Sequence, residues 1–122
     1  DTETLCAAYN DSLGISAAFN LNLLNRINRE LDATFDLTAF RHYAPWVEEH
    51  GRIEMRLYST VNQNVTVAGT AFQFTEGEYI HTENSHKYSV AEFQALASSS
   101  GYEPVQVWVD DAERFSLHYL RG

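Results

Sequence analysis

The densest group of hydroxyl and ionisable side chains lies in residues 79–88, Y-I-H-T-E-N-S-H-K-Y. In an extended chain successive side chains alternate between two faces. The alternation predicts two sets: Tyr79, His81, Glu83 and Ser85 on one face, and Thr82, Asn84 and His86 on the other. A carboxylate and a hydroxyl two residues apart can bind one small polar ligand, because the first accepts hydrogen bonds and the second donates or accepts them. The alternative interpretation is a solvated strand end that leads into a helix.

Other kinds of chemistry find weaker support in the sequence. His81 and His86 would lie on opposite faces of a strand, and no second group of ligands follows at a defined spacing, so we expect no metal site. Cys6 has no assignable base, and there is no G-x-S-x-G elbow. Neither a G-x-G-x-x-G motif nor a P-loop is present. The residues alone therefore predict an α+β domain whose polar strand end can hold a small polar ligand.

Composition narrows the class of partner. The 122 residues carry a net charge of −9, from 17 acidic and 8 basic residues without a basic cluster, which disfavours nucleic acid. No apolar run approaches the roughly 18 residues of a membrane span, so we expect no membrane partner. The single Cys6 cannot form an internal disulfide, which suits a cytoplasmic protein. The chain shows no signal peptide and begins without Met, so we expect a piece of a longer protein.

The clearest predicted helix spans residues 15–31. An apolar stripe recurs every four residues, at Ile15, Phe19, Leu23, Ile27 and Leu31, and Ala18 and Leu24 widen it. This pattern predicts an amphipathic helix that packs the stripe against the core. We expect Ser16 to cap its start, and we expect the Asn residues at positions 20, 22, 25 and 28 to form a solvated face.

The remaining pattern is that of short antiparallel strands. Residues 52–61 alternate as in a half-buried strand, with Ile53, Met55, Leu57, Ser59 and Val61 on the apolar face. Pro45 interrupts an extended stretch at 43–47, which predicts an edge strand. Short turns between the strands favour an antiparallel meander. Ser89 and Glu92 form a capping box that begins a helix, and a β-hairpin closes the chain.

Several ordered motifs resemble one enzyme family. Residues 9–22, Y-N-D-x-x-G-I-S-A-A-F-N-x-N, are similar to its A-Y-D-D-x-x-G-V-T-A-x-F-N-x-N signature. Residues 27–42 contain I-N-R-E-L and F-D-x-x-A-F-x-H, and residues 52–55 are R-I-E-M. Residues 82–88 match T-E-x-S-x-K-[FY], and residues 108–116 resemble W-T-D-x-x-x-x-F-[SA]. The chain is thus identified as similar to the histidine-specific, S-adenosylmethionine-dependent methyltransferases, over nearly its whole length.

The resemblance implies an enzyme that trimethylates the α-amino group of histidine to hercynine, in ergothioneine biosynthesis. It covers only the C-terminal part of such enzymes, whose Rossmann half, which binds S-adenosylmethionine, lies upstream. Residues 1–88 would then form most of the substrate-recognition domain. Residues 89–122 would add a helix and a hairpin to the edge of the methyltransferase sheet. We expect the parent protein to be a monomer.

The resemblance also implies site residues. The family uses the Tyr of A-Y-D-D and the Glu and Ser of T-E-x-S to bind histidine, and the Met of R-I-E-M lines the same pocket. The substrate-binding candidates carried over are Tyr9, Phe19, Met55, Glu83, Asn84 and Ser85. Asn10 departs from the first Asp of A-Y-D-D, and Asn84 is expected to point away from the pocket. Methyl transfer to an amine is a displacement at sulfonium that requires positioning and no protein nucleophile, so no catalytic residue is predicted.

Two other interpretations fit the same residues. The domain could be a non-catalytic module that binds an amino acid. It could also be inert as a fragment, because the cofactor domain of the resembled enzymes is missing from it.

Overall fold

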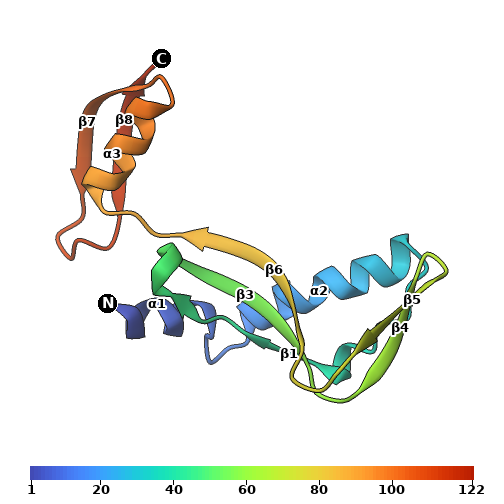
Figure 1. Ribbon diagram of the computed structural model, residues 1–122. Coiled ribbons are helices and arrows are strands. Elements are labelled where there is room, and N and C mark those ends of the chain that lie inside the picture. Colours follow the sequence, from blue (N-terminus) through green and yellow to red (C-terminus); the bar gives the residue numbers. More distant parts are fainter. The chain divides into compact units, whose positions relative to one another are not determined.

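The computed structural model describes all 122 residues, which form two compact units, residues 1–86 and residues 87–122 (Figure 1). Both units combine helices with β-structure. Every pairing between strands is antiparallel. The predicted α+β class with antiparallel sheets is therefore confirmed. None of the helices is both long enough and apolar enough to cross a membrane.

The sheet of the first unit is built around β3 (Arg52–Ser59). β6 (Tyr79–His86) pairs along one edge of β3, and β1 (Phe40–Tyr43) and β2 (Trp46–Val47) share the other. The break between β1 and β2 falls at Ala44 and Pro45. Proline has no N–H to give to a ladder, so it interrupts the strand only where the chain lies at an edge. The predicted edge position is confirmed.

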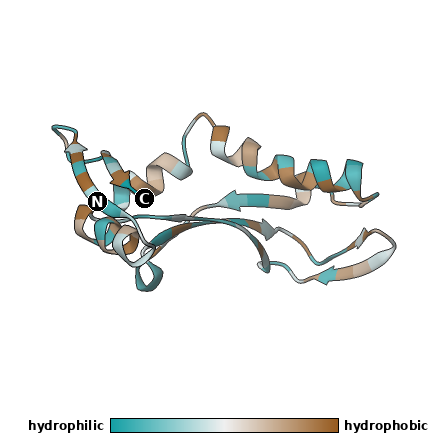
Figure 2. Cartoon of the chain, turned by 90° about the horizontal axis from the view of Figure 1, so that it is seen from above, coloured by the Kyte–Doolittle hydropathy of each residue, from teal (hydrophilic) through white to brown (hydrophobic).

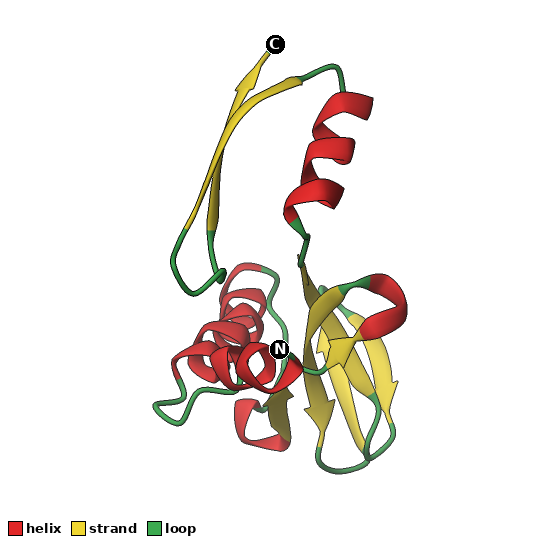
Figure 3. Ribbon diagram, turned by 90° about the vertical axis from the view of Figure 1, so that its left-hand side faces the viewer, coloured by secondary structure: helices red, strands yellow, loops and turns green.

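Two helices cover this sheet. α1 (Thr2–Tyr9) and α2 (Ile15–Glu30) lie on one side of the strands of their unit, as Figure 3 shows. Two short 3-10 helices, η1 (Leu37–Ala39) and η2 (Glu48–His50), precede β1 and β3. The helices thus form one layer and the sheet a second.

The start of α2 is capped from the preceding turn. The Asp11 carboxylate accepts hydrogen bonds from the backbone N–H groups of Ser16 and Ile15, at 3.0 and 2.9 Å. These bonds hold the pKa of Asp11 below its usual value. Gly14 sits before the helix at φ 70°, a left-handed conformation that suits glycine, and it gives no side-chain cap. The prediction that Ser16 caps the helix is therefore wrong.

The face of α2 that packs on the sheet contains only the edge of the predicted stripe. Leu24 is 1% exposed and packs with Phe40 and Leu57 in the main core, while the predicted stripe residues Ile15, Phe19, Leu23 and Leu31 are exposed. Figure 2 shows hydrophobic and hydrophilic residues mixed along this helix. The helix carries two apolar stripes, and the one that includes Leu21 and Leu24 faces the strands. The predicted burial is therefore confirmed for Leu24, at the edge of the predicted stripe, and is wrong for these four exposed residues.

Alternation along β3 is confirmed for its apolar face. Ile53, Met55, Leu57 and Ser59 are all buried, whereas Val61 lies beyond the end of the strand and is exposed. The opposite face is not simply solvated, because Glu54 is only 5% exposed. Arg52 and Arg56 form ion pairs with the Glu54 carboxylate on that face.

A separate hairpin follows β3. β4 (Gln63–Val67) and β5 (Thr70–Phe74) form a two-stranded sheet. Ala68 and Gly69 between them have φ values of 48° and 81°. Positive φ at both central residues is the hallmark of the type I′ turn, whose twist matches that of the paired strands.

The second unit is a helix followed by a hairpin, as predicted. α3 (Val90–Ser99) begins at Ser89, whose hydroxyl accepts from the Glu92 N–H while the Glu92 carboxylate accepts from the Ser89 N–H. This confirms the capping box. β7 (Glu103–Val109) and β8 (Ser116–Arg121) form the hairpin. The ring of Phe93 on α3 packs against His118 on β8, with centroids 4.4 Å apart.

Candidate functional site

A β-bulge in β6 decides which side chains share a face. Met55 pairs with Glu83, but the next residue of β3, Arg56, pairs with His81, so Thr82 is an extra residue on β6. Directly paired residues of an antiparallel sheet present their side chains on the same face. Glu83 therefore lies on the face of Met55, which is the face that packs against the helices.

Glu83 and Ser85 share one face of β6, as predicted. The prediction that Tyr79 and His81 lie on that same face is wrong. Ser85 pairs with Ile53, on the same face as Met55, but Tyr79 and His81 fall beyond the bulge and lie on the opposite face. His81 meets Asn84 there, with Nε2 2.6 Å from the amide oxygen. The Arg56 guanidinium lies 4.3 Å from the Tyr79 ring centre on that same face. The extra residue Thr82 thus moves Tyr79 and His81 to the face opposite Glu83 and Ser85.

The helix-side face brings four predicted site residues together. Tyr9 is the last residue of α1, and its hydroxyl lies 2.7 Å from the Ser85 hydroxyl on β6. Met55 is 3% exposed and belongs to a core cluster with Ala44, against which Tyr9 packs. Glu83, paired with Met55, is an exposed residue of β6. Tyr9, Met55, Glu83 and Ser85 thus gather at one place on the sheet; we call these four residues the Tyr9–Glu83 site.

Two other predicted residues lie apart from this site. Phe19 is 67% exposed on α2, on the side of the helix that turns away from the strands. Asn84 lies on the opposite face of β6, bonded to His81, as the alternation had predicted.

Asn10 fixes the end of α1 and so fixes Tyr9. Its Nδ2 donates to the carbonyl oxygens of Cys6 and Ala44, at 2.8 and 2.9 Å, and its Oδ1 accepts from the Ala44 N–H at 2.9 Å. An aspartate at this position could accept the last bond but could not donate the first two. The departure from the family motif therefore has a structural role beside the site.

Asn20 is a buried residue that the sequence analysis missed. It was expected on a solvated face but is 3% exposed, and its amide contacts His42 and Thr82, on β1 and β6. The signal lay in its spacing, because Asn20 stands four residues before the buried Leu24 and so shares its side of the helix.

The face of the sheet opposite the site carries a buried carboxylate. Glu54 accepts from Arg52 at 2.8 Å and from Arg56 at 2.6 Å, one arginine for each carboxylate oxygen. These charge-assisted bonds lower the pKa of Glu54 to about 2, against the opposing effect of burial. The group clamps β3 from the side away from Met55.

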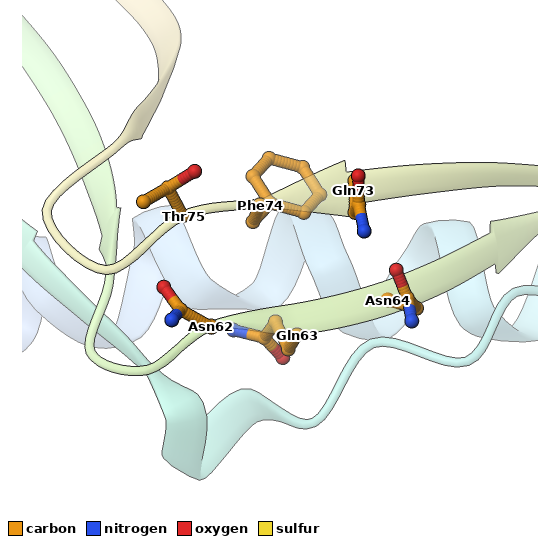
Figure 4. Close-up of a pocket in the computed structure, with 6 residues that line it drawn as sticks. All are labelled: Asn62, Gln63, Asn64, Gln73, Phe74 and Thr75. Carbon is orange, nitrogen blue, oxygen red and sulfur yellow. The ribbon is translucent and has the colours of Figure 1, made fainter.

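A hollow of about 330 Å³ lies elsewhere, at the base of the β4–β5 hairpin. Figure 4 shows the residues that line it: Asn62, Gln63, Asn64, Gln73, Phe74 and Thr75. The Gln63 amide donates to Ser59 Oγ at 2.6 Å and to the Ala39 carbonyl at 3.3 Å. The Asn62 amide oxygen accepts from the Glu76 N–H. These amides hold the hairpin, and none of the predicted site residues lines the hollow. No group of three or more His, Cys, Asp or Glu side chains is arranged to hold a metal ion.

Comparisons with known proteins give the chain its relatives. A family model described as histidine-specific methyltransferase, SAM-dependent, matches residues 1–122. A histidine N-alpha-methyltransferase of Mycolicibacterium smegmatis is 41% identical over 119 residues, and one of Mycobacterium tuberculosis is 39% identical over 119 residues. Each alignment covers 96% of this chain but 37% of the relative. An uncharacterised protein of Sinorhizobium fredii is 31% identical over 108 residues.

Proposed function

This chain belongs to the family of histidine-specific, S-adenosylmethionine-dependent methyltransferases, and from that membership we propose that it forms the histidine-recognition part of an enzyme that methylates the α-amino group of histidine. The chain spans 37% of the length of the curated relatives that it matches. The methyltransferase activity is therefore proposed for a complete enzyme of which this chain forms one part. The observation that carries the proposal is the 2.7 Å contact between Tyr9 and Ser85, beside Glu83 and over the buried Met55.

The chemistry of these groups suits an imidazole ring. A neutral imidazole has one N–H donor and one acceptor nitrogen. Glu83 is an exposed residue, so its carboxylate is accessible to accept the N–H in a charge-assisted hydrogen bond. Ser85 and Tyr9 can each donate or accept, so the pair can adjust to the other ring nitrogen. Met55 packs in the core next to these groups and gives the site an apolar base.

The residues of this segment do not fit the cofactor. Dinucleotide-type sites place a glycine-rich turn between a parallel strand and a helix. Every strand pairing here is antiparallel, and no G-x-G-x-x-G motif occurs. We therefore assign S-adenosylmethionine to the portion of the enzyme that corresponds to the rest of the relatives' length. In the same proposal, the β7–β8 hairpin joins the sheet of that portion, and the product is the trimethylated hercynine of ergothioneine synthesis.

Specificity follows from what an incorrect substrate would leave unpaired. A ligand without the ring N–H would bury the Glu83 carboxylate without a partner, and such a mismatch costs more than the lost bond itself. Glu83 should thus contribute to recognition of histidine far more than to folding.

Glu83→Ala tests this function in the complete enzyme. We expect the KM for histidine to rise by roughly tenfold or more, the equivalent of one charge-assisted bond. The matched control is Glu76→Ala, which removes a second exposed carboxylate, at the turn before β6, and should leave the KM unchanged. An unaltered KM in Glu83→Ala, with both variants folded, would refute the proposed site.

A further inference from the structure

A buried polar network lies next to the Tyr9–Glu83 site. Its centre is Asn20, whose Nδ2 lies 2.9 Å from His42 Nδ1 and 3.3 Å from the Arg56 carbonyl oxygen. The Asn20 Oδ1 is 2.7 Å from the Thr82 hydroxyl, which lies 3.0 Å from the Met55 carbonyl oxygen. On the far side of the imidazole ring, His42 Nε2 is 2.8 Å from the Tyr9 carbonyl oxygen. The network therefore connects α1, α2, β1, β3 and β6.

Three backbone carbonyls fix the direction of every bond in this network. A carbonyl oxygen only accepts, so the Arg56 oxygen requires the nitrogen of the Asn20 amide to face it. The Tyr9 oxygen likewise requires His42 to carry its proton on Nε2, which leaves Nδ1 as the acceptor from Asn20. Thr82 must then be the donor, and its single hydroxyl proton is shared between two acceptors, the Asn20 amide oxygen and the Met55 carbonyl oxygen. The orientation of all three side chains is thus set by the backbone.

The network holds the bulge that places Glu83. The register of β3 and β6 shifts between Met55 and Arg56, and the carbonyls of these two residues are the ones that Thr82 and Asn20 engage. Thr82 is the extra residue of β6, so its bonds anchor the bulge to α2. Without the bulge, continued alternation would put Glu83 and Tyr79 on one face. The residue after Thr82 is Glu83 itself.

The other end of the network holds Tyr9. His42 binds the Tyr9 backbone, while the Tyr9 hydroxyl meets Ser85. Tyr9 and Ser85, whose hydroxyls are in contact, are therefore positioned by the same buried network. The network holds Ser85 through β6 and Tyr9 through α1.

We propose that Asn20, His42 and Thr82 are positioning residues for histidine recognition, which act by fixing the bulge that presents Glu83 and the backbone that presents Tyr9. This inference rests on the proposed function. None of the three is assigned a contact with the substrate. A purely structural role would instead make their substitution lower stability without a specific effect on histidine binding.

Thr82→Val in the complete enzyme tests the proposal, because valine keeps the shape of threonine and loses only the hydroxyl. We expect the Kd for histidine, measured by calorimetry, to rise about tenfold, the loss typical of a misplaced charge-assisted bond. Thr82→Ser restores the hydroxyl and should stay within about twofold of the wild type. The matched control is Thr60→Val, which removes a hydroxyl that also donates to a backbone carbonyl, that of Ala39 at 3.1 Å. It should leave the Kd unchanged.

A double-mutant cycle with Glu83→Ala separates positioning from simple damage. If Thr82 acts through Glu83, adding Thr82→Val to Glu83→Ala should raise the Kd by less than about twofold, since contacting sites are not additive. His42→Phe, which cuts the bond to Tyr9, gives a second test should Thr82→Val fail to fold, and we expect a similar rise. Wild-type affinity in both variants, or a full tenfold effect of Thr82→Val in the Glu83→Ala background, would overturn the proposal. If Glu83→Ala itself binds histidine normally, the proposed function fails instead.

Discussion

Glu54 shows how a single residue can be buried as an ion in a small sheet. Its two oxygens are each bonded to one arginine, and the arginine side chains are themselves about one-fifth exposed, at 21% for Arg52 and 18% for Arg56. Removing one member of such a group leaves charges without partners, which typically costs about 3 kcal/mol. The clamp braces β3 from the face opposite Met55, so we interpret Glu54 as a residue that stabilises the fold.

The pKa of Glu54 makes this stabilisation depend on pH. In the folded chain the pKa is lowered from 4.5 to about 2, so the unfolded chain takes up the proton first as the pH falls. The stabilisation is present above the unfolded value and is lost as the pH decreases through that window. We therefore expect Glu54→Gln to be less stable than the wild type at pH 7, by about 3 kcal/mol, and the difference to shrink near pH 3.

Urea unfolding of the wild type and of Glu54→Gln, at pH 7 and near pH 3, measures this difference in unfolding free energy. The contributions of all other carboxylates are the same in both proteins and drop out of the difference. Equal differences at the two pH values would show that Glu54 is not held as an ion.

At the scale of elements, α2 presents an apolar stripe that the other elements of its own unit leave exposed. Ile15, Phe19 and Leu23 are exposed, whereas Leu24 is buried in the core. The relatives are far longer than this segment. We expect the remaining part of the complete enzyme to cover the stripe, which explains why two apolar stripes exist on one helix.

The two stripes should respond differently to substitution in the 122-residue chain. Phe19→Ser with Leu23→Ser should change the unfolding free energy by less than about 1 kcal/mol, because exposed sites contribute little, and should reduce the binding of a hydrophobic dye. Leu24→Ala should cost about 2–5 kcal/mol, as cavities in cores do. Chemical unfolding and dye fluorescence measure both effects. A large loss of stability from the serine pair would place that stripe in the core after all.

The elements also mark the limit of what could be predicted from the sequence. The shared face of Glu83 and Ser85 was predictable, because a spacing of two residues on one strand determines it locally. The bulge at Thr82 was not, because it is fixed by bonds to α2, far away in the chain. The spacing of Asn20 from Leu24 indicates the packed side of α2, but the partners that satisfy its buried amide lie on β1, β3 and β6 and could not be predicted from that spacing.

On the scale of the whole molecule, the proposed function assigns the imidazole ring of the substrate to this chain and the cofactor to another part of the enzyme. Its first unit carries the Tyr9–Glu83 site, and its second unit is a helix and a hairpin whose large apolar residues, Trp108, Phe115 and Leu117, are exposed. Under the proposed function, we expect other parts of the enzyme to cover these apolar residues. The proposed enzyme is therefore one in which the cofactor and the ring of the substrate are held by different parts of the polypeptide.

The most direct test of this account is the discrimination between histidine and its two ring-N-methylated isomers by the complete enzyme. If Glu83 accepts the imidazole N–H, the wild type should disfavour the isomer methylated at that nitrogen by about 100-fold or more in kcat/KM. Glu83→Ala should reduce this ratio to about tenfold or less, because the acceptor is gone and space is free. An unchanged ratio in Glu83→Ala would contradict the claim that Glu83 recognises the imidazole ring.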